Sequence, residues 1–161
     1  MTCAALTISV RITRKAAMGA IFAAMAAGGA LAQTAGSAGP ATIEVTVSGI
    51  TNDKGEVQLA LCMPGTGFPD CGSRALRTAT VAVSQGQARA SFRQVPPGVY
   101  AVSAFHDANG NGRLDTFLGI PREGYGFSNN PGLRMRAPRF DEARITVKGA
   151  TTANIELRYI F

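Results

Sequence analysis

The sequence predicts an all-β domain, an antiparallel β-sandwich of about seven strands in two sheets with one long loop. Two observations carry this prediction. Apolar and polar residues alternate with period two in several short stretches between residues 42 and 161, and turn-forming residues separate these stretches. In the same part of the chain, no stretch of ten or more residues shows the 3.6-residue period of an amphipathic helix. With 46% hydrophobic residues the chain can bury a core, which excludes a disordered protein.

Each predicted strand follows from its own residues. Ile43, Val45 and Val47 alternate with polar neighbours, so one face of this strand is buried and the other meets water. Residues 99–106 are apolar on both faces, and we therefore expect the central strand here. The turn sequence SQGQ at residues 84–87 separates two alternating stretches and predicts a β-hairpin. The predicted strands are residues 43–48, 57–61, 81–83, 88–92, 99–106, 145–147 and 155–159.

The N-terminus has the pattern of a secretory signal peptide. A basic cluster at residues 11–15 precedes an uncharged run over 18–32 that ends in the small-residue sequence Ala-Leu-Ala. The run is about 15 residues long, whereas a bilayer crossing needs about 20, so a retained membrane anchor is the weaker alternative. We expect a signal peptide over 1–32, a flexible linker over 33–41 and the sandwich over 42–161. The protein would be periplasmic or secreted, with no stable membrane span after cleavage.

Cleavage would lower the positive charge of the protein. Arg11, Arg14 and Lys15 leave with the signal peptide, so the net charge falls from +6 to +3. Such a small excess does not favour nucleic acid as a partner. We expect a small ligand or an envelope component instead. The basic segment 134–139 is either a solvated loop or a contact with an anionic envelope surface, which salt would weaken.

The cysteines agree with export. Cys3 lies in the signal peptide, which leaves Cys62 and Cys71 as an even pair in an oxidising compartment. The prolines and glycines between them let the chain fold back, so we expect a disulfide; two free thiols are the alternative. Closing a loop of about ten residues stabilises a fold by about 2.5–3 kcal/mol in the chain-entropy model.

Residues 106–142 form one segment that does not alternate and is far longer than the usual connection of about 4–6 residues. Its start has the oxygen spacing of the first half of an EF-hand calcium loop, with Gly112 at the turn position. The predicted Ca²⁺ ligands are Asp107, Asn109, Asn111, the backbone carbonyl of Arg113, and Asp115.

The calcium motif is incomplete, which leaves two readings open. Leu118 occupies the place of the bidentate glutamate, so Glu123 or Asp141 would have to supply the missing carboxylate. In the metal-free reading, Asp and Asn side chains accept hydrogen bonds from backbone N–H groups of the loop.

The same segment holds the candidate ligand-binding residues of a binding or structural module. Tyr125 and Phe127 form either an aromatic platform for a sugar or peptide or a plug for the open end of the sandwich. The full candidate set is His106, Glu123, Tyr125, Phe127 and Asn129. We assign no catalytic residue. The alternative function is a hydrolase that uses His106, the single histidine of the chain, as a base; it needs a nucleophile and a nearby carboxylate to orient the ring, for which Ser128 and Asp107 are the candidates.

The run VPPGVYAVSAFHDANGNGRLDTFLGIPREGYGFSNN, residues 95–130, resembles the signature of an exported bacterial family, domain-of-unknown-function family 2141. The resemblance extends from about residue 42 to 159. It implies a signal peptide and no established activity, so it brings no catalytic residues with it. The Cys62–Cys71 pair is not part of the family pattern. The Pro-Pro-Gly-x-Tyr sequence is also similar to prealbumin-like and immunoglobulin-like sandwich modules, an analogy of fold alone.

Overall fold

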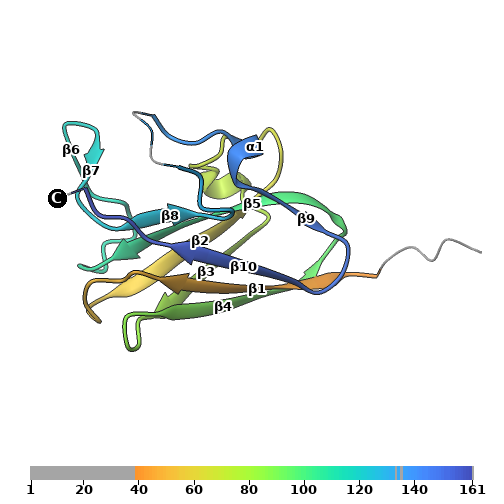
Figure 1. Ribbon diagram of the computed structural model, residues 1–161, viewed down its shortest axis with the longest axis horizontal. Helices are drawn as coiled ribbons and strands as arrows, with labels where there is room; N and C mark the ends of the chain where they lie inside the picture. Colours follow the sequence, from red (N-terminus) through yellow and green to blue (C-terminus); the bar gives the residue numbers. More distant parts are fainter. Residues whose placement is uncertain (1–38, 133, 135, 161) are drawn as a thin grey trace, which may run out of the picture. The chain divides into compact units, whose positions relative to one another are not determined.

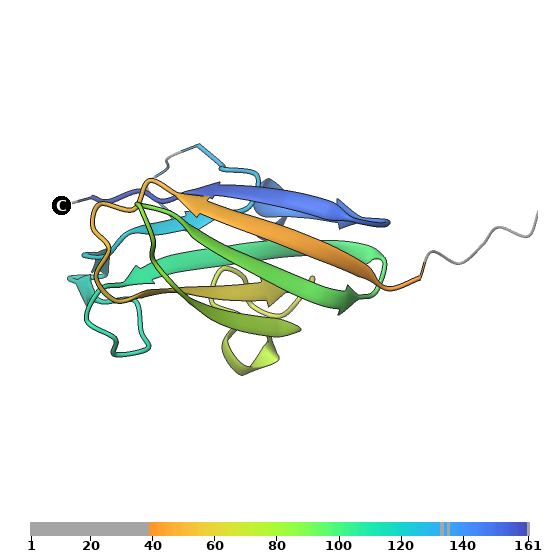
Figure 2. The same ribbon diagram turned by 90° about the horizontal axis from the view of Figure 1, so that it is seen from below.

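The alternating stretches of the sequence form two β-sheets that face each other (Figures 1 and 2). The computed structural model describes residues 39–132, 134 and 136–160. The first sheet has the order β10-β1-β4, with strands Thr151–Glu156, Ala41–Ser48 and Ala88–Val95. The second has the order β3-β2-β5-β8, with β9 also paired to β5; its strands are Arg77–Ala82, Glu56–Cys62, Gly98–Asp107, Tyr125–Phe127 and Arg144–Val147. These layers confirm the predicted all-β sandwich.

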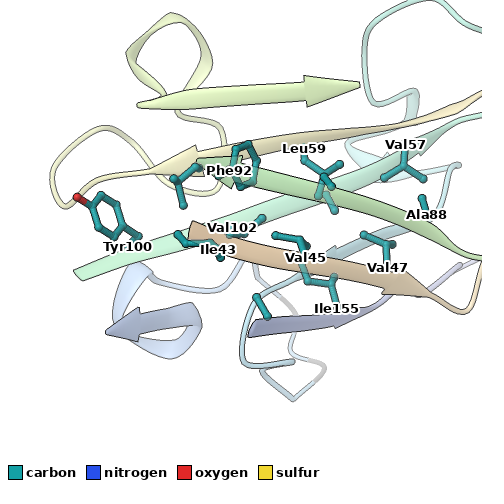
Figure 3. Close-up of a cluster of buried hydrophobic side chains, with 14 of the residues drawn as sticks. Ile43, Val45, Val47, Val57, Leu59, Ala88, Phe92, Tyr100, Val102 and Ile155 are labelled. Atoms are coloured by element: carbon teal, nitrogen blue, oxygen red, sulfur yellow. The ribbon is translucent and has the colours of Figure 1, made fainter. Parts of the chain in front are cut away.

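The side chains between the two sheets form the core. Figure 3 shows Ile43, Val45 and Val47 of β1 lying among side chains of the facing strands. All three are at most 1% exposed. Each large aliphatic side chain buried in this way contributes about 1.5–3 kcal/mol against the entropy of the unfolded chain. Other members of the core include Val57, Leu59, Leu61, Ala88, Phe92, Tyr100, Val102 and Ile155.

Strand β5 is central, as its apolar sequence predicted. It pairs with β2 along one edge, and with β8 and β9 in succession along the other. Residues 101 and 102 are fully buried on opposite faces of the strand. A strand covered on both faces has no polar side to show, which explains the lost alternation.

Two expectations about pairing need correction. The predicted β-hairpin over 81–92 forms its turn, because Ser84 and Gln87 exchange backbone hydrogen bonds of 2.8 and 3.1 Å. The strands on either side, β3 and β4, then enter different sheets, so the prediction of a hairpin was wrong. In addition, β1 and β10 run parallel, with Ile43 opposite Thr151, whereas the sequence analysis expected antiparallel strands throughout. The first difference arises because the chain crosses from one sheet to the other at the turn between β3 and β4.

Cys62 and Cys71 form the predicted disulfide, and their Cα atoms lie 5.9 Å apart. Both residues are buried. The bond ties the end of β2 to the short 3₁₀ helix Gly72–Arg74. Within the closed loop, Phe68 makes edge-on contacts with Phe127 and Phe140, at ring-centroid distances of 5.6 and 6.1 Å. The disulfide loop is therefore packed against the segment that the sequence analysis treated as one long loop.

That segment, residues 106–142, is more regular than expected. It contains the hairpin of β6 (Thr116–Phe117) and β7 (Ile120–Pro121), the sheet strand β8, and helix α1 (Phe140–Ala143). Among the residues that the structure describes, no helix has the length and apolarity that a bilayer crossing requires. The signal peptide predicted over 1–32, and residues 33–38 of the predicted linker, lie outside the described residues.

Candidate functional site

The Asp/Asn loop begins where β5 ends, and its first carboxylate is turned inward. Asp107 is fully buried, and its two carboxylate oxygens accept hydrogen bonds from the backbone N–H groups of Asn111 and Gly112, at 3.0 and 2.7 Å. Asn109 Oδ1 accepts from the N–H of Asn111, and Asn111 Oδ1 from that of Arg113, at 3.1 and 2.9 Å. The oxygens at these three predicted ligand positions therefore satisfy the backbone of a tight turn.

Asp115 is the point on which the loop converges. The side-chain amides of Asn111 and Asn109 donate to its carboxylate at 3.0 and 2.8 Å. These two hydrogen bonds, followed by the nearby charges of Arg113 and Arg122, hold the pKa of Asp115 below its usual value. The carboxylate therefore stays ionised at neutral pH.

Glu123 closes the base of the loop. Its Oε1 accepts the N–H of Ala108 at 3.2 Å, and its Oε2 accepts the N–H of Asp115 at 2.9 Å. Of the two carboxylates that the sequence offered to complete a calcium site, the structure brings Glu123 to the loop. Asp141 lies in α1, where it is 3.7 Å from Arg144.

The loop as folded does not present a ready metal site. Over the described part of the chain, no three His, Cys, Asp or Glu side chains are grouped so that they could hold a metal ion. The atoms of Asn109 and Asn111 that face Asp115 are amide nitrogens, which donate hydrogen bonds and do not bind cations. Both amides would have to rotate before their oxygens could act as ligands. Calcium binding by this loop stays a prediction.

His106 lies behind the loop, buried and engaged at both ring nitrogens. Nε2 is 2.7 Å from the carbonyl oxygen of Lys54, and Nδ1 is 2.9 Å from the hydroxyl of Tyr159. A carbonyl only accepts, so Nε2 donates to Lys54, and in the neutral ring Nδ1 accepts from the hydroxyl of Tyr159. The imidazole therefore locks the chain segments of Lys54 and Tyr159 together. Ser128, the nucleophile of the hydrolase alternative, bonds instead with Val102 and Ala143.

Two glycines let residues 123–127 lie close to the first sheet. A Cβ atom on Gly124 would collide with the ring of Tyr159. One on Gly126 would lie 2.7 Å from Ile155 Cγ2 and 2.8 Å from the carbonyl oxygen of Glu156. Such distances are shorter than carbon contacts allow, so the GYG sequence is needed where β8 spans the gap between the two sheets.

The next residues fasten this segment. Asn129 donates its side-chain amide to the carbonyl of Glu142 at 3.1 Å. Asn130 accepts the N–H of Glu156 at 2.9 Å and donates to the carbonyl of Asn154 at 2.9 Å. Asn129 and Asn130 have φ angles of 63° and 41°, which asparagine tolerates better than most residues. Asn129, a predicted ligand-binding residue, is thus placed in an internal contact; ligand binding by it stays a prediction.

Tyr125 and Phe127 line a hollow on the outside of β8. We call it the arginine–aromatic pocket; it is lined by Tyr125, Gly126, Phe127, Asn130, Pro131, Gly132, Arg134, Arg136, Pro138, Glu156 and Arg158. The two aromatic rings meet edge-on at a centroid distance of 5.8 Å. The pocket joins two groups that the sequence analysis treated separately, the aromatic segment and the basic segment 134–139.

The three guanidinium groups of the pocket differ in how they are held. Arg136 forms a two-pronged pair with Glu142, with both N···O distances at 2.8 Å. Arg158 donates to the carbonyl of Pro131 at 2.9 Å. Arg134 approaches Glu142 no closer than 3.7 Å, and its side chain is 61% exposed. Arg134 therefore keeps most of its donors available to a ligand.

Glu142 organises the basic segment from the start of α1. It accepts hydrogen bonds from the Arg136 guanidinium and from the backbone N–H of Arg139, the latter at 2.7 Å. These bonds, with the positive charges of Arg136 and Arg134, lower the pKa of Glu142 to about 2. An ionised Glu142 fixes the guanidinium of Arg136 in place across the whole neutral and mildly acidic range.

Sequence reasoning missed the parts of the pocket that depend on topology. Asn130 entered only as the last residue of the run that resembles a family signature, and nothing in the local sequence distinguishes Arg158 from other surface residues. Arg158 reaches the site because its backbone pairs with that of Tyr125 through two hydrogen bonds of 2.9 and 3.0 Å. That pairing joins residues 33 positions apart and carries no local pattern.

Comparison with known proteins places the chain in a family. A solved structure of a DUF3823 family protein from Parabacteroides merdae is 16% identical, with a TM-score of 0.32; the match covers 77% of this chain and 48% of that one. This chain therefore spans about half the length of that structure. No curated protein matches the chain. The model of the DUF2141 family, described as an uncharacterised protein conserved in bacteria, matches residues 45–155, and the chain belongs to this family.

Proposed function

We propose that the protein is an exported binding module that holds a small anionic group in the arginine–aromatic pocket. The observation that carries this proposal is the convergence of Arg134, Arg136 and Arg158 on a hollow bordered by Tyr125 and Phe127. Guanidinium groups bind carboxylates and phosphates through paired N–H donors, and aromatic rings offer an apolar surface beside them. This chemistry favours a ligand that joins an anionic group to an apolar or planar body.

The charge and size of the pocket limit further which ligands it can bind. Arg136 is neutralised by Glu142, and Glu156 adds a negative charge to the rim, so the positive charge open to a ligand belongs to Arg134 and Arg158. The cavity volume is about 30 Å³. A space of that size accepts one carboxylate-sized group and leaves the remainder of the ligand on the surface. A buried sugar ring would need a larger cavity, so we expect recognition of an anionic end group.

The experiment is an NMR titration with benzoate, which combines a carboxylate with a planar apolar ring. We expect saturable shifts of the backbone amide signals of Gly126 and Gly132, and none with benzamide, which has the same ring and no charge. Arg134→Gln should weaken benzoate binding about tenfold, the effect of losing a charge-assisted hydrogen bond.

Arg93 supplies the matched control. It is an exposed arginine of β4, in the other sheet, so Arg93→Gln removes the same charge without touching the pocket. Benzoate binding should be unchanged in this variant. Equal shifts with benzamide, or equal binding by wild type and Arg134→Gln, would contradict the proposal.

Calcium binding is the second candidate, and one observation favours it. The side chains of Asn109, Asn111 and Asp115 already meet at one point, at donor–acceptor distances of 2.8 and 3.0 Å. Rotation of the two amides would turn their oxygens toward that point, with the Asp115 carboxylate beside them. A calcium ion there would stabilise the loop by holding these oxygen atoms together. We assign it no part in a reaction.

Thermal unfolding in calcium and in chelator tests this second candidate. At ten times its Kd, calcium adds about 1.4 kcal/mol of stability. For a domain of this size, that raises the midpoint by about 4 °C. Asp115→Asn should remove the rise, and magnesium should not replace calcium. No rise at millimolar calcium would rule the metal out.

The proposal that the protein is exported depends on its first 32 residues. The basic, apolar and small-residue regions of the first 32 residues support a signal peptide, and the disulfide is compatible with an oxidising compartment. N-terminal sequencing of protein recovered from the periplasm or medium should give Gln33 as the first residue. Protein that stays in the cytoplasm with an intact N-terminus would contradict export.

A further inference from the structure

The β6–β7 hairpin exposes an apolar tip to solvent. Phe117 is 57% exposed, Leu118 87% and Ile120 41%. We call these three residues the apolar tip. Figure 1 shows the hairpin standing off the two sheets at the end where β5 leads into the Asp/Asn loop. Phe117 and Ile120 pair across the hairpin, and Leu118 lies in the turn between them, so three large apolar side chains are exposed within four positions. A monomeric domain rarely exposes large apolar side chains together without a use for them.

The backbone makes Leu118 the least expected residue of the tip. Leu118 and Gly119 have φ angles of 51° and 78°, so the turn has positive φ at both central positions. Asparagine followed by glycine is the preferred sequence for such a turn, because both residues tolerate this conformation. Leucine is strained there and, being 87% exposed, gains almost no burial in return. The fold explains Gly119 and does not explain Leu118.

Positive charge lies at the base of the hairpin. Thr116 pairs with Pro121, and the N–H of Arg122 donates to the carbonyl of Asp115 at 2.9 Å, which extends the ladder by one step. Arg122 directly follows β7, two residues after Ile120, and is exposed. Arg113 is exposed on the preceding loop. The Asp115 carboxylate accepts hydrogen bonds from the side-chain amides of Asn109 and Asn111. The positive charges of Arg113 and Arg122 are near enough to help lower its pKa.

We propose that the apolar tip docks the protein onto the surface of an anionic lipid bilayer. A convex tip needs no complementary groove, because the fluid interface of a bilayer closes around inserted side chains. Arg113 and Arg122 would then lie at the level of the headgroups, where each positive charge strengthens attachment to anionic lipid. The proposal uses residues outside the arginine–aromatic pocket, so it stands apart from the proposed function.

The test is co-sedimentation with vesicles of phosphatidylcholine alone and of phosphatidylcholine with 30% phosphatidylglycerol. Wild type and all variants are purified from the same producing cell, so that they share one N-terminus. Wild type should bind the anionic vesicles at least tenfold more tightly than the neutral ones, and 0.5 M salt should weaken that binding.

Leu118→Asn is the decisive variant because it introduces the Asn-Gly sequence that the turn prefers. The fold is kept while the most exposed apolar side chain is removed. We expect at least a tenfold loss of vesicle binding, together with a thermal midpoint no lower than that of wild type. Val99→Thr is the control, since Val99 is 37% exposed at the other end of β5 and should leave binding unchanged.

The outcomes separate the proposal from its rivals. Loss of binding in Leu118→Asn, and partial loss in Arg122→Gln, would support it. Equal vesicle binding by wild type and Leu118→Asn would overturn it. So would concentration-dependent dimers in sedimentation that Leu118→Asn abolishes, with no vesicle binding by wild type, because the tip would then be covered by a second copy of the chain.

Discussion

The side chain of Ser128 lies where two strands, β8 and β9, pair with the same edge of β5. Strands β8 and β9 both pair with β5, and Val102 lies between the two pairings. Ser128 Oγ accepts the N–H of Val102 at 2.8 Å, in place of a backbone carbonyl, and donates to the carbonyl of Ala143. The hydroxyl is fully buried, so water cannot replace either bond. The Ser128 hydroxyl therefore links β8 and β9 at the point on β5 where one strand ends and the other begins.

Ser128→Ala should lower the free energy of unfolding by about 1–3 kcal/mol, the cost of leaving buried backbone groups without partners. Urea unfolding followed by circular dichroism measures it. Ser91→Ala is the control, because Ser91 donates to Glu44 on an exposed surface at 2.8 Å and should matter by less than about 0.5 kcal/mol. A loss of stability no larger than that of the control would contradict the role of Ser128 in linking β8 and β9.

Gly126→Ala should be as damaging, for a steric reason. The new methyl group would meet Ile155 and the Glu156 carbonyl at distances below 3 Å, and we expect a loss of about 1–3 kcal/mol as β8 moves away. Gly149→Ala is the matched control, because a Cβ there meets nothing within 4 Å. Unchanged unfolding midpoints in both variants would show that β8 does not need this close approach.

At the scale of elements, local patterns predicted where the strands lie better than which strands pair with each other. Alternation placed β1, β2 and β4 correctly, and the apolar run placed β5. Strand β8 was missed because it has three residues and its central residue, Gly126, has weak strand propensity, while the close approach that requires this glycine is set by the other sheet. Strand β10 begins at Thr151, four residues before the prediction, since the turn takes fewer residues than expected. Which sheet each strand joins is a long-range outcome that no local period encodes.

The disulfide loop is an element whose contribution can be isolated. Reduction should lower the free energy of unfolding by about 2.5–3 kcal/mol, as the chain-entropy model gives for a loop of about ten residues. Urea unfolding with and without reductant measures the difference. A Cys62→Ala, Cys71→Ala double variant should be insensitive to reductant. Equal stability of the oxidised and reduced wild type would contradict this prediction.

Helix α1 should respond to acid through Glu142. The pKa of Glu142 is about 2 in the folded state, below the ordinary value of 4.5, because its carboxylate is held by Arg136 and the backbone of Arg139. The stabilisation is therefore complete above pH 5 and is lost as the pH falls toward 2. Unfolding of wild type and Glu142→Gln should differ at pH 7 and converge near pH 2. A difference that does not depend on pH would contradict this assignment.

At the scale of the whole molecule, the sandwich gathers distant segments on the outside of β8. Residues 125–127, 130–132, 134, 136, 138, 156 and 158 meet there because β8 pairs with β5 on one side and with the chain after β10 on the other. The sequence predicted the disulfide between Cys62 and Cys71, because the cysteines carry a local signal. It did not predict that the aromatic and basic segments form one pocket, because that depends on how the two sheets are joined.

The most direct test of the account is the Kd of benzoate, measured by NMR titration of wild type, Arg134→Gln and Arg93→Gln. We predict saturable binding by wild type and Arg93→Gln with similar Kd values, and about tenfold weaker binding by Arg134→Gln. The same Kd in all three proteins, or no saturable shift at Gly126 and Gly132 in wild type, would contradict the claim that the pocket binds anionic groups.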